Sequence, residues 1–181
     1  MSMTYLGAPL KSDKQDWGTP QAFFDYVEKT FDVKFTLDAC ASAHNYKVKN
    51  YMTEEDDALT LDWHFEIDGS DTFEEVWLNP PFGKGGKLQK AFICHAAAQA
   101  VLGNCRVFAL IPARTDTRLF HDVVMNYASA VYFIKGRLNH EHDDRTPRGS
   151  APFPSMLCIF DGKVKNCHLD TLTPTKKDRG F

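Results

Sequence analysis

The sequence lacks apolar runs of membrane-spanning length and the common phosphate-binding signatures. Of its 181 residues 43% are hydrophobic, yet no stretch approaches the roughly 20 consecutive apolar residues of a membrane helix. Neither G-x-G-x-x-G nor G-x-x-x-x-G-K-[ST] occurs, and the stretch GKGGKL at 83–88 lacks the spacing of the second motif. Dinucleotide and nucleoside-triphosphate binding are therefore disfavoured, whereas binding of a nucleoside without phosphates stays open.

Cysteines are few, and their spacing does not suit a metal site. Their number is odd and no two form a C-x-x-C pair. The pairs Cys94-His95 and Cys167-His168 have no second pair at zinc-type spacing. We expect free thiols and no metal at the following residues: Cys40, Cys94, Cys105, Cys158 and Cys167.

An apolar signal-peptide core is also missing from the first 20 residues, so we expect a cytoplasmic protein without membrane contacts. The length suits one domain that buries roughly 70% of the surface of its unfolded chain. We assign residues 17–162 to this domain, 1–16 to an N-terminal extension and 163–181 to a C-terminal tail. The oligomeric state cannot be inferred from the sequence.

Apolar strand-like runs alternate with helix-like runs along the chain. Thr19 is the predicted N-cap of the first helix, and Pro20 its first residue. Such alternation is typical of an α/β fold with a mostly parallel sheet and helices on both faces. The predicted strands are 35–42, 75–82, 106–114, 130–136 and 155–162, and the predicted helices are 20–31, 88–103 and 117–128.

The segment VWLNPPFGKG at 76–85 ends an apolar run with two prolines and an aromatic residue. Because proline donates no backbone N–H and fixes its own φ, this pair ends a strand and stiffens the loop that follows. A stiff loop holds the Asn79 amide, the Pro80 carbonyl and the Phe82 ring in one arrangement, which suits a planar ligand with an amino group. In a parallel sheet such loops lie beyond the carboxyl ends of the strands, where ligands bind. Three other segments are expected at the same edge: 38–41, 112–114 and 136–137.

Together these motifs resemble the phage-type DNA adenine methyltransferases. The similar segments are, in order, DWGTPQAFFDYV, LDACAS, YMTEEDDALTLDW, WLNPPFG, ALIPARTDTRLFH, IKGRL and APFPSMLCIF. The resemblance runs from about residue 17 to 160 and implies a single-domain, Rossmann-like fold that binds S-adenosylmethionine and has an antiparallel final strand. It also implies methyl transfer to the exocyclic N6 amine of adenine in double-stranded DNA, after extrusion of the base.

The resemblance also implies roles for individual residues. Asn79, Pro80, Pro81 and Phe82 match the catalytic tetrapeptide. The Asn79 side chain and the Pro80 carbonyl are expected to accept hydrogen bonds from the adenine amine, while Phe82 stacks on the ring. Many relatives have tyrosine at this last position, and alanine or serine replaces the usual glycines after Asp38. The residues expected to contact the cofactor are Trp17, Thr19, Pro20, Asp38, Ala39, Ala41, Asp57 and Asn79.

The net charge of −3 means that DNA must meet a local basic patch. Basic residues are spread through the later half of the chain, some of them in a polar loop expected at 138–155. A solvated charged face is the alternative interpretation. The residues expected to contact DNA are Lys84, Lys87, Arg114, Arg137, Arg145 and Arg148.

The expected reaction requires no nucleophilic residue and no metal. The lone pair of an aromatic amine is delocalised into the ring, and two acceptors that bind its hydrogens favour a pyramidal nitrogen. Such a nitrogen can attack a sulfonium methyl group in line, so catalysis is mostly positioning and electrostatics. The same arrangement serves methylation of RNA amines or of protein glutamine, so these alternatives and a noncatalytic DNA-binding module stay open.

Overall fold

The structure is a computed structural model that describes residues 17–64, 66–67, 70–71, 74–103, 105–163 and 166–181. The N-terminal extension predicted at 1–16 lies outside the described residues. All five cysteines are free, as predicted. In the described part of the chain, no helix is long and apolar enough to cross a membrane.

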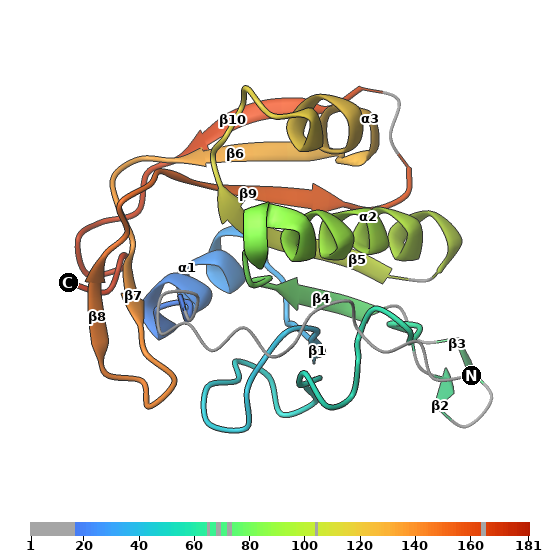
Figure 1. The fold of residues 1–181 in the computed structure, drawn as a ribbon, viewed down its shortest axis with the longest axis horizontal. Coiled ribbons are helices and arrows are strands. Elements are labelled where there is room, and N and C mark those ends of the chain that lie inside the picture. Colours follow the sequence, from blue (N-terminus) through green and yellow to red (C-terminus); the bar gives the residue numbers. More distant parts are fainter. Residues whose placement is uncertain (1–16, 65, 68–69, 72–73, 104, 164–165) are drawn as a thin grey trace.

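A six-stranded sheet in the order β1-β4-β5-β9-β6-β10 forms the centre of the molecule (Figure 1). β9 runs antiparallel to both of its neighbours, and the other five strands run in one direction. The sheet is therefore mainly parallel, which agrees with the predicted α/β class. The strands are β1 (Leu37–Asp38), β4 (Glu74–Leu78), β5 (Cys105–Pro112), β6 (Ala130–Ile134), β9 (Ser155–Phe160) and β10 (His168–Leu172).

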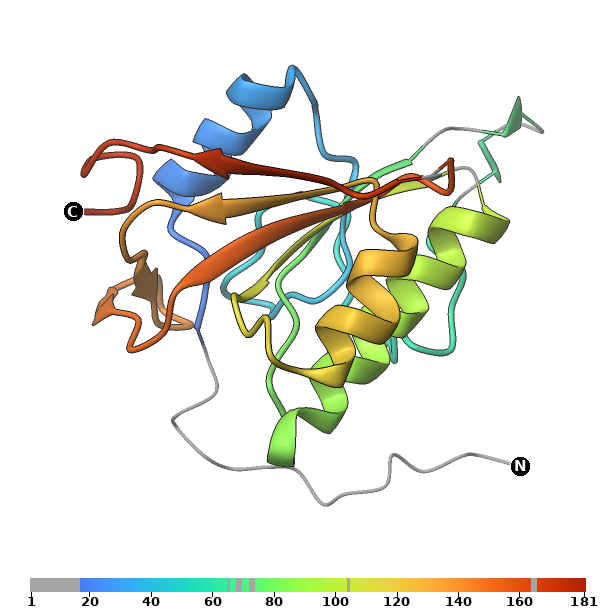
Figure 2. The same cartoon turned by 90° about the horizontal axis from the view of Figure 1, so that it is seen from above.

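The central strands separate two hydrophobic cores. Successive side chains of a strand point to opposite faces, and on β4 Val76 and Leu78 pack in one core while Trp77 packs in the other. Helix α1 contributes to the Trp77 core and α2 to the Val76 core, so the two helices lie on opposite sides of the sheet (Figure 2). The helical segments are α1 (Gln21–Phe31), α2 (Lys87–Leu102), the π-helical η2 (Phe120–Val124) and α3 (Met125–Tyr127).

In the described part of the chain, two short strand pairs and one 3-10 turn lie outside the central sheet. β2 (Glu66–Ile67) pairs with β3 (Ser70–Asp71), and β7 (Asn139–Glu141) pairs with β8 (Pro147–Ser150). The segment 138–155 was predicted to be a polar loop, and it contains the β7–β8 hairpin instead. A 3-10 turn, η1 (Lys84–Gly86), joins the loop after β4 to α2.

Helix α1 begins one residue later than predicted. Pro20 is the N-cap, with a ψ of 133°, and no side chain of the cap residue bonds to the helix. The prediction that Thr19 is the cap is therefore wrong. A carboxylate distant in the sequence caps the helix instead, because Glu141 Oε1 accepts a hydrogen bond from the backbone N–H of Gln21 at 3.0 Å. A negative charge at this end of a helix also interacts favourably with the helix dipole.

The central sheet continues beyond residue 162. β10 pairs with β6 in parallel register, so the last strand of the chain is parallel. The antiparallel strand implied by the resemblance is β9, which precedes β10 in the chain and lies inside the sheet. β10 shows no buried apolar run because it lies at the sheet edge, and only Leu172 of its five residues is buried.

Candidate active site

The carboxyl ends of β1 and β4 bring two of the predicted motifs together. Asp38 ends β1 and is paired with Trp77 of β4, two residues before Asn79. The N–H of Ala39 continues this pairing and donates to the carbonyl of Trp77 at 3.0 Å. Because both strands point the same way, the Asp38 segment and the Asn79–Phe82 loop leave the sheet at the same edge.

Asn79 has its side-chain amide oriented by the N-terminal segment. Its Nδ2 donates to the carbonyl oxygen of Trp17 at 2.6 Å, and the side chain is half-buried. A planar amide that donates on one side presents its oxygen on the other side as an acceptor. The hydrogen bond to Trp17 therefore directs Asn79 Oδ1 away from that carbonyl.

Phe82 belongs to an aromatic cluster that also contains Trp17 and Phe153. The Phe82 and Phe153 rings meet edge to face with centroids 5.2 Å apart, and Phe153 lies 5.6 Å from Trp17. The guanidinium carbon of Arg148 lies 4.4 Å from the Trp17 ring centroid, a favourable cation–π distance. Phe82 and Phe153 are half-buried, so each residue retains some accessible surface.

His140, on β7, is a buried residue of this cluster. It is 3% exposed, and its Nδ1 lies 3.2 Å from the carbonyl oxygen of Trp17 and 3.1 Å from that of Gly18. Since carbonyl oxygens only accept, Nδ1 must carry the hydrogen, which leaves Nε2 as an acceptor. Nε2 is buried without a hydrogen-bond partner among the described residues. Burial lowers the pKa of His140, which favours the neutral ring at pH 7.

Asp38 is a buried carboxylate at the end of β1. Its Oδ2 accepts the backbone N–H of Lys47 at 2.9 Å, and its Oδ1 accepts that of Cys40 at 3.4 Å. Burial raises the pKa of Asp38 to about 6, although the two hydrogen bonds act in the opposite direction. A ligand that brings further hydrogen-bond donors or positive charge would therefore stabilise the ionised form of Asp38.

An ion pair connects the Asp38 segment to the β7–β8 hairpin. Lys47 Nζ lies 3.0 Å from Glu141 Oε2, and the lysine side chain is 3% exposed. Burial lowers the pKa of Lys47, and Glu141 opposes this effect. Glu141 also exchanges two backbone hydrogen bonds with Gly18. The hairpin, the 17–21 segment and the Asp38 segment are thus held as one unit.

Several of the predicted cofactor residues carry buried acceptors. Thr19 Oγ1 and Asp57 Oδ1 are buried without a hydrogen-bond partner in the described part of the chain. Asp57 also has a positive φ of 53°.

The other predicted cofactor residues are buried to different degrees. Ala39 is buried and Ala41 is half-buried, and the N–H of Ala41 donates to the carbonyl of Met52 at 2.9 Å. The predicted residue Pro20 is buried at the start of α1.

The predicted DNA-binding residues have different surroundings. Lys87, Arg114 and Arg137 are exposed, whereas the side chain of Lys84 lies outside the described residues. Arg145 donates to the carbonyls of His44 and Tyr46, at 3.1 Å in each case. Arg148 lies over Trp17, as described above, so Arg145 and Arg148 both make contacts within the protein.

Four residues of the site were not predicted from the sequence: Lys47, His140, Glu141 and Phe153. His140, Glu141 and Phe153 come from the hairpin region, more than 100 residues after Trp17 in the sequence, and only the folded chain brings them to the site. Two signals in the sequence pointed to this region. Phe153 lies in APFPS, directly before a predicted strand, and the polar loop expected at 138–155 contains His140, Glu141 and Phe153.

Comparison with known proteins identifies the family. The sequence model of the family named DNA N-6-adenine-methyltransferase (Dam) matches residues 8–178, a range that includes the whole candidate site. The chain belongs to the Dam family. A Dam relative from Haemophilus phage HP1 (strain HP1c1), named DNA N-6-adenine-methyltransferase, is 36% identical over 157 residues. This match covers 85% of the chain and 83% of the relative, and it confirms the predicted phage-type resemblance.

Proposed function

We propose that this Dam family member transfers a methyl group from S-adenosylmethionine to the N6 amine of adenine in double-stranded DNA, at the Asn79–Phe82 loop. The observation that carries the proposal is the 2.6 Å hydrogen bond from Asn79 Nδ2 to the Trp17 carbonyl. Because Nδ2 makes this bond, the side-chain oxygen is directed away from the Trp17 carbonyl and remains an acceptor. A preorganised acceptor of this kind is what an amine nucleophile requires.

The adenine amine has two hydrogens, and the loop offers two acceptors for them. Asn79 Oδ1 binds one hydrogen and the Pro80 carbonyl binds the other. Both acceptors withdraw the hydrogens from the ring plane and favour a nitrogen whose lone pair is available for attack. The stiffness of the Pro80–Pro81 pair keeps the two acceptors at a constant separation during the reaction.

Phe82 provides an aromatic face for the extruded base. Extrusion from a duplex costs a few kcal/mol, and stacking on an aromatic side chain offsets about 1–3 kcal/mol of that cost. The Phe153 ring packs against Phe82 with centroids 5.2 Å apart and planes 78° apart, a contact that limits movement of the Phe82 ring.

The residues present fit S-adenosylmethionine, which supplies an electrophilic methyl group when bound. The molecule carries amine and hydroxyl donors, and the site offers buried acceptors at Asp38, Asp57 Oδ1 and Thr19 Oγ1. Ala39 and Ala41 are small enough to allow close approach of a ligand to the β1 terminus. Asp38 and Asp57 would hold the cofactor, with Trp17, Thr19 and Pro20 closing the site from the N-terminal side.

Transfer of isotopically labelled methyl groups tests this function. The protein is incubated with labelled S-adenosylmethionine and duplex DNA, and the digested nucleosides are separated by mass. We expect label in N6-methyladenine from wild-type protein. Asn79→Ala should reduce the rate on the order of 10²–10³-fold, because alanine offers no acceptor. Its cofactor affinity should fall much less than the rate, and its melting temperature should fall only slightly, because one half-buried hydrogen bond to Trp17 is lost.

Parallel reactions with RNA and with protein acceptors separate the alternatives. Label that appears in RNA or in glutamine, and not in DNA, would reject the DNA reaction. DNA binding with no label in any acceptor would indicate a noncatalytic module. If Asn79→Ala kept a rate within about tenfold of wild type, the loop would be structural and the proposed mechanism would fail.

A further inference from the structure

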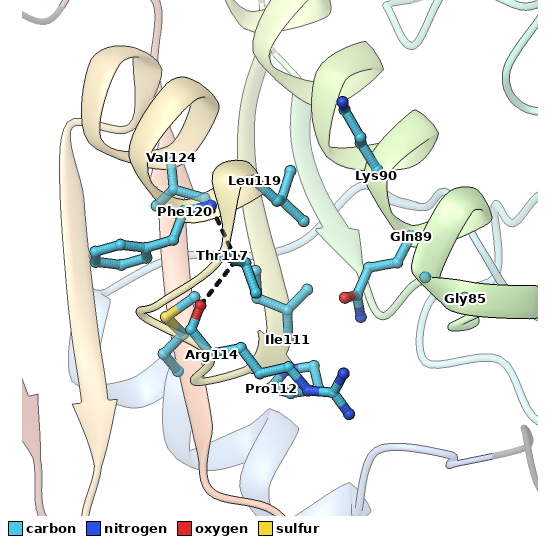
Figure 3. A pocket seen from close by; sticks show the side chains of 12 residues that line it. Gly85, Gln89, Lys90, Ile111, Pro112, Arg114, Thr117, Leu119, Phe120 and Val124 are labelled. Carbon is cyan, nitrogen blue, oxygen red and sulfur yellow. Dashed lines mark hydrogen bonds between the residues drawn. The ribbon is translucent and has the colours of Figure 1, made fainter.

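A hollow of about 180 Å³ lies between the start of α2, the carboxyl end of β5 and the segment 114–124 (Figure 3). Its inner wall is apolar and contains Ile111, Phe120, Val124 and Met156, each at most 7% exposed. None of the residues predicted to bind the adenine or the cofactor lines it. The hollow is therefore separate from the candidate active site, although it lies on the same edge of the sheet.

Gln89 contributes a buried hydrogen-bond donor to this hollow. The residue is 8% exposed, and its Nε2 is buried with no hydrogen-bond partner among the residues that the structure describes. In Figure 3 its side-chain amide extends from α2 toward Pro112 and Arg114. A buried donor without an acceptor is unfavourable, so an acceptor bound at this position would be stabilised.

The N-terminus of α2 faces the same space. Gly86 is the N-cap, no side chain of the cap bonds to the helix, and the first turn contains no acidic residue. Gly85 and Gly86 have positive φ angles of 65° and 74°, and no atom lies within 4 Å of the position of an added Cβ at either residue. The positive end of a 16-residue helix is thus open to a ligand, a setting that favours anions.

Arg114 supplies a full positive charge. It is exposed, and its guanidinium extends toward the Gln89 amide in Figure 3. No salt bridge involves Arg114 within the described ranges. Lys90 also lines the hollow, but in Figure 3 its side chain points away from the Gln89 amide and the Arg114 guanidinium. The hydroxyl of Thr117 already donates to the Arg114 carbonyl at 2.9 Å.

We propose that the hollow binds one phosphodiester group of the DNA backbone, held by Gln89 Nε2, the Arg114 guanidinium and the N-terminus of α2. This inference rests on the proposed function, since DNA must be the substrate. The N–H of Gln89 also bonds to the carbonyl of Phe82 at 3.4 Å, so the phosphate site is joined to the catalytic loop. A phosphate bound here fixes the position of the DNA strand relative to Phe82.

DNA duplexes with single neutral methylphosphonates test the proposal. Each duplex carries one substitution, and affinity is measured by fluorescence anisotropy without methyl transfer. In wild type we expect at least one position at which the neutral group weakens binding by about 10- to 100-fold, because hydrogen bonds to a charged group are stronger than those to a neutral group. Gln89→Leu and Arg114→Ala should each weaken binding to unmodified DNA. In either variant, the methylphosphonate at that position should weaken binding further by less than about threefold, because the contact it removes is already lost. Lys90→Ala is the matched control and should keep the full loss.

The proposal would be overturned if each methylphosphonate weakened binding of Gln89→Leu and of Arg114→Ala by the same factor as it weakens binding of wild type, at every position in the duplex. Arg114→Ala changes an exposed side chain, so the test does not depend on the folding of Gln89→Leu. NMR of the Gln89 side-chain amide adds a second readout: a shift with inorganic phosphate, but none with DNA, would assign the hollow to a free anion. Failure of wild type to bind DNA would instead reject the proposed function.

Discussion

The ring of His140 donates from Nδ1 to the carbonyl oxygen of Trp17, at a distance of 3.2 Å. The same oxygen accepts the amide of Asn79 at 2.6 Å. A buried imidazole therefore helps to hold the group that orients the proposed catalytic amide. His140 acts through Trp17 and is a positioning residue in this arrangement.

Replacement of His140 should lower kcat with little change in the KM for cofactor. His140→Phe keeps the ring shape but removes the donor, and loss of one hydrogen bond of 0.5–1.5 kcal/mol corresponds to a reduction of about 2- to 13-fold. His140→Asn can place a donor near the Nδ1 position and should restore part of kcat. Steady-state kinetics with the melting temperatures of both variants check this. Equal kcat losses in the two variants, in proportion to lost stability, would indicate a packing role only.

Substitutions at Phe82 should depend on the presence of an aromatic face. Phe82→Tyr and Phe82→Trp should keep activity, whereas Phe82→Ala should lose about 1–3 kcal/mol of base binding. A fluorescent adenine analogue at the target position brightens when the base leaves the stack, and it reports the loss directly. If Phe82→Ala extrudes the base as well as wild type but melts at a much lower temperature, its contact with Phe153 serves packing.

Asp38→Asn should change how stability depends on pH. Burial raises the pKa of Asp38 to about 6 from 3.8. Between these values the unfolded chain releases the proton while the folded protein keeps it, so this residue lowers stability as pH rises and its effect levels off above about pH 6. The total effect is on the order of 3 kcal/mol.

Urea unfolding of wild type and Asp38→Asn from pH 3 to 8 measures this effect. Between pH 3.8 and about pH 6, the free energy of unfolding of wild type should fall relative to that of the variant. Above about pH 6 the difference between the two should stay constant. Cofactor affinity of wild type should rise over the same window, because the ionised carboxylate is the better acceptor. Parallel stability curves throughout would contradict the raised pKa.

Arg145 and Arg137 should respond differently to alanine substitution. Arg145 donates to two backbone carbonyls of the 44–46 segment, so Arg145→Ala should lower the free energy of unfolding by about 1–2 kcal/mol. Arg137 is exposed, and Arg137→Ala should flatten the log–log salt dependence of DNA affinity by about 0.9. Salt titrations of DNA affinity and urea unfolding of both variants provide the comparison. If Arg145→Ala flattened the salt dependence and Arg137→Ala lowered the free energy of unfolding, Arg145 would contact DNA and Arg137 would support the fold.

The sequence predicted the elements whose patterns are local. The apolar strand at 106–114 and the helix at 88–103 form close to their expected bounds, because each buries a continuous or periodic apolar face. The strand predicted at 75–82 also forms, but it ends at Leu78, before the prolines. The helix cap was mispredicted because its carboxylate comes from Glu141. β10 was missed because an edge strand of mostly exposed residues has no apolar signal.

The supporting residues of the site could not be predicted for a related reason. His140 and Lys47 are polar residues in polar surroundings of the sequence, and their burial arises only when the hairpin meets the 17–21 segment. By contrast, Asn79 and Phe82 were recognisable because two prolines mark the loop that carries them.

β9 lies between β5 and β6, although it follows both of them in the chain. Until residues 155–160 have left the ribosome, the β1-β4-β5 half and β6 have no strand to join them, and the apolar edge of β5 has no partner. Pairing between distant segments slows folding, and an open apolar edge favours aggregation. The nascent chain therefore emerges as far as residue 154 without the strand that joins the two parts of the sheet. Its yield in the cell should therefore depend on chaperones and on translation speed.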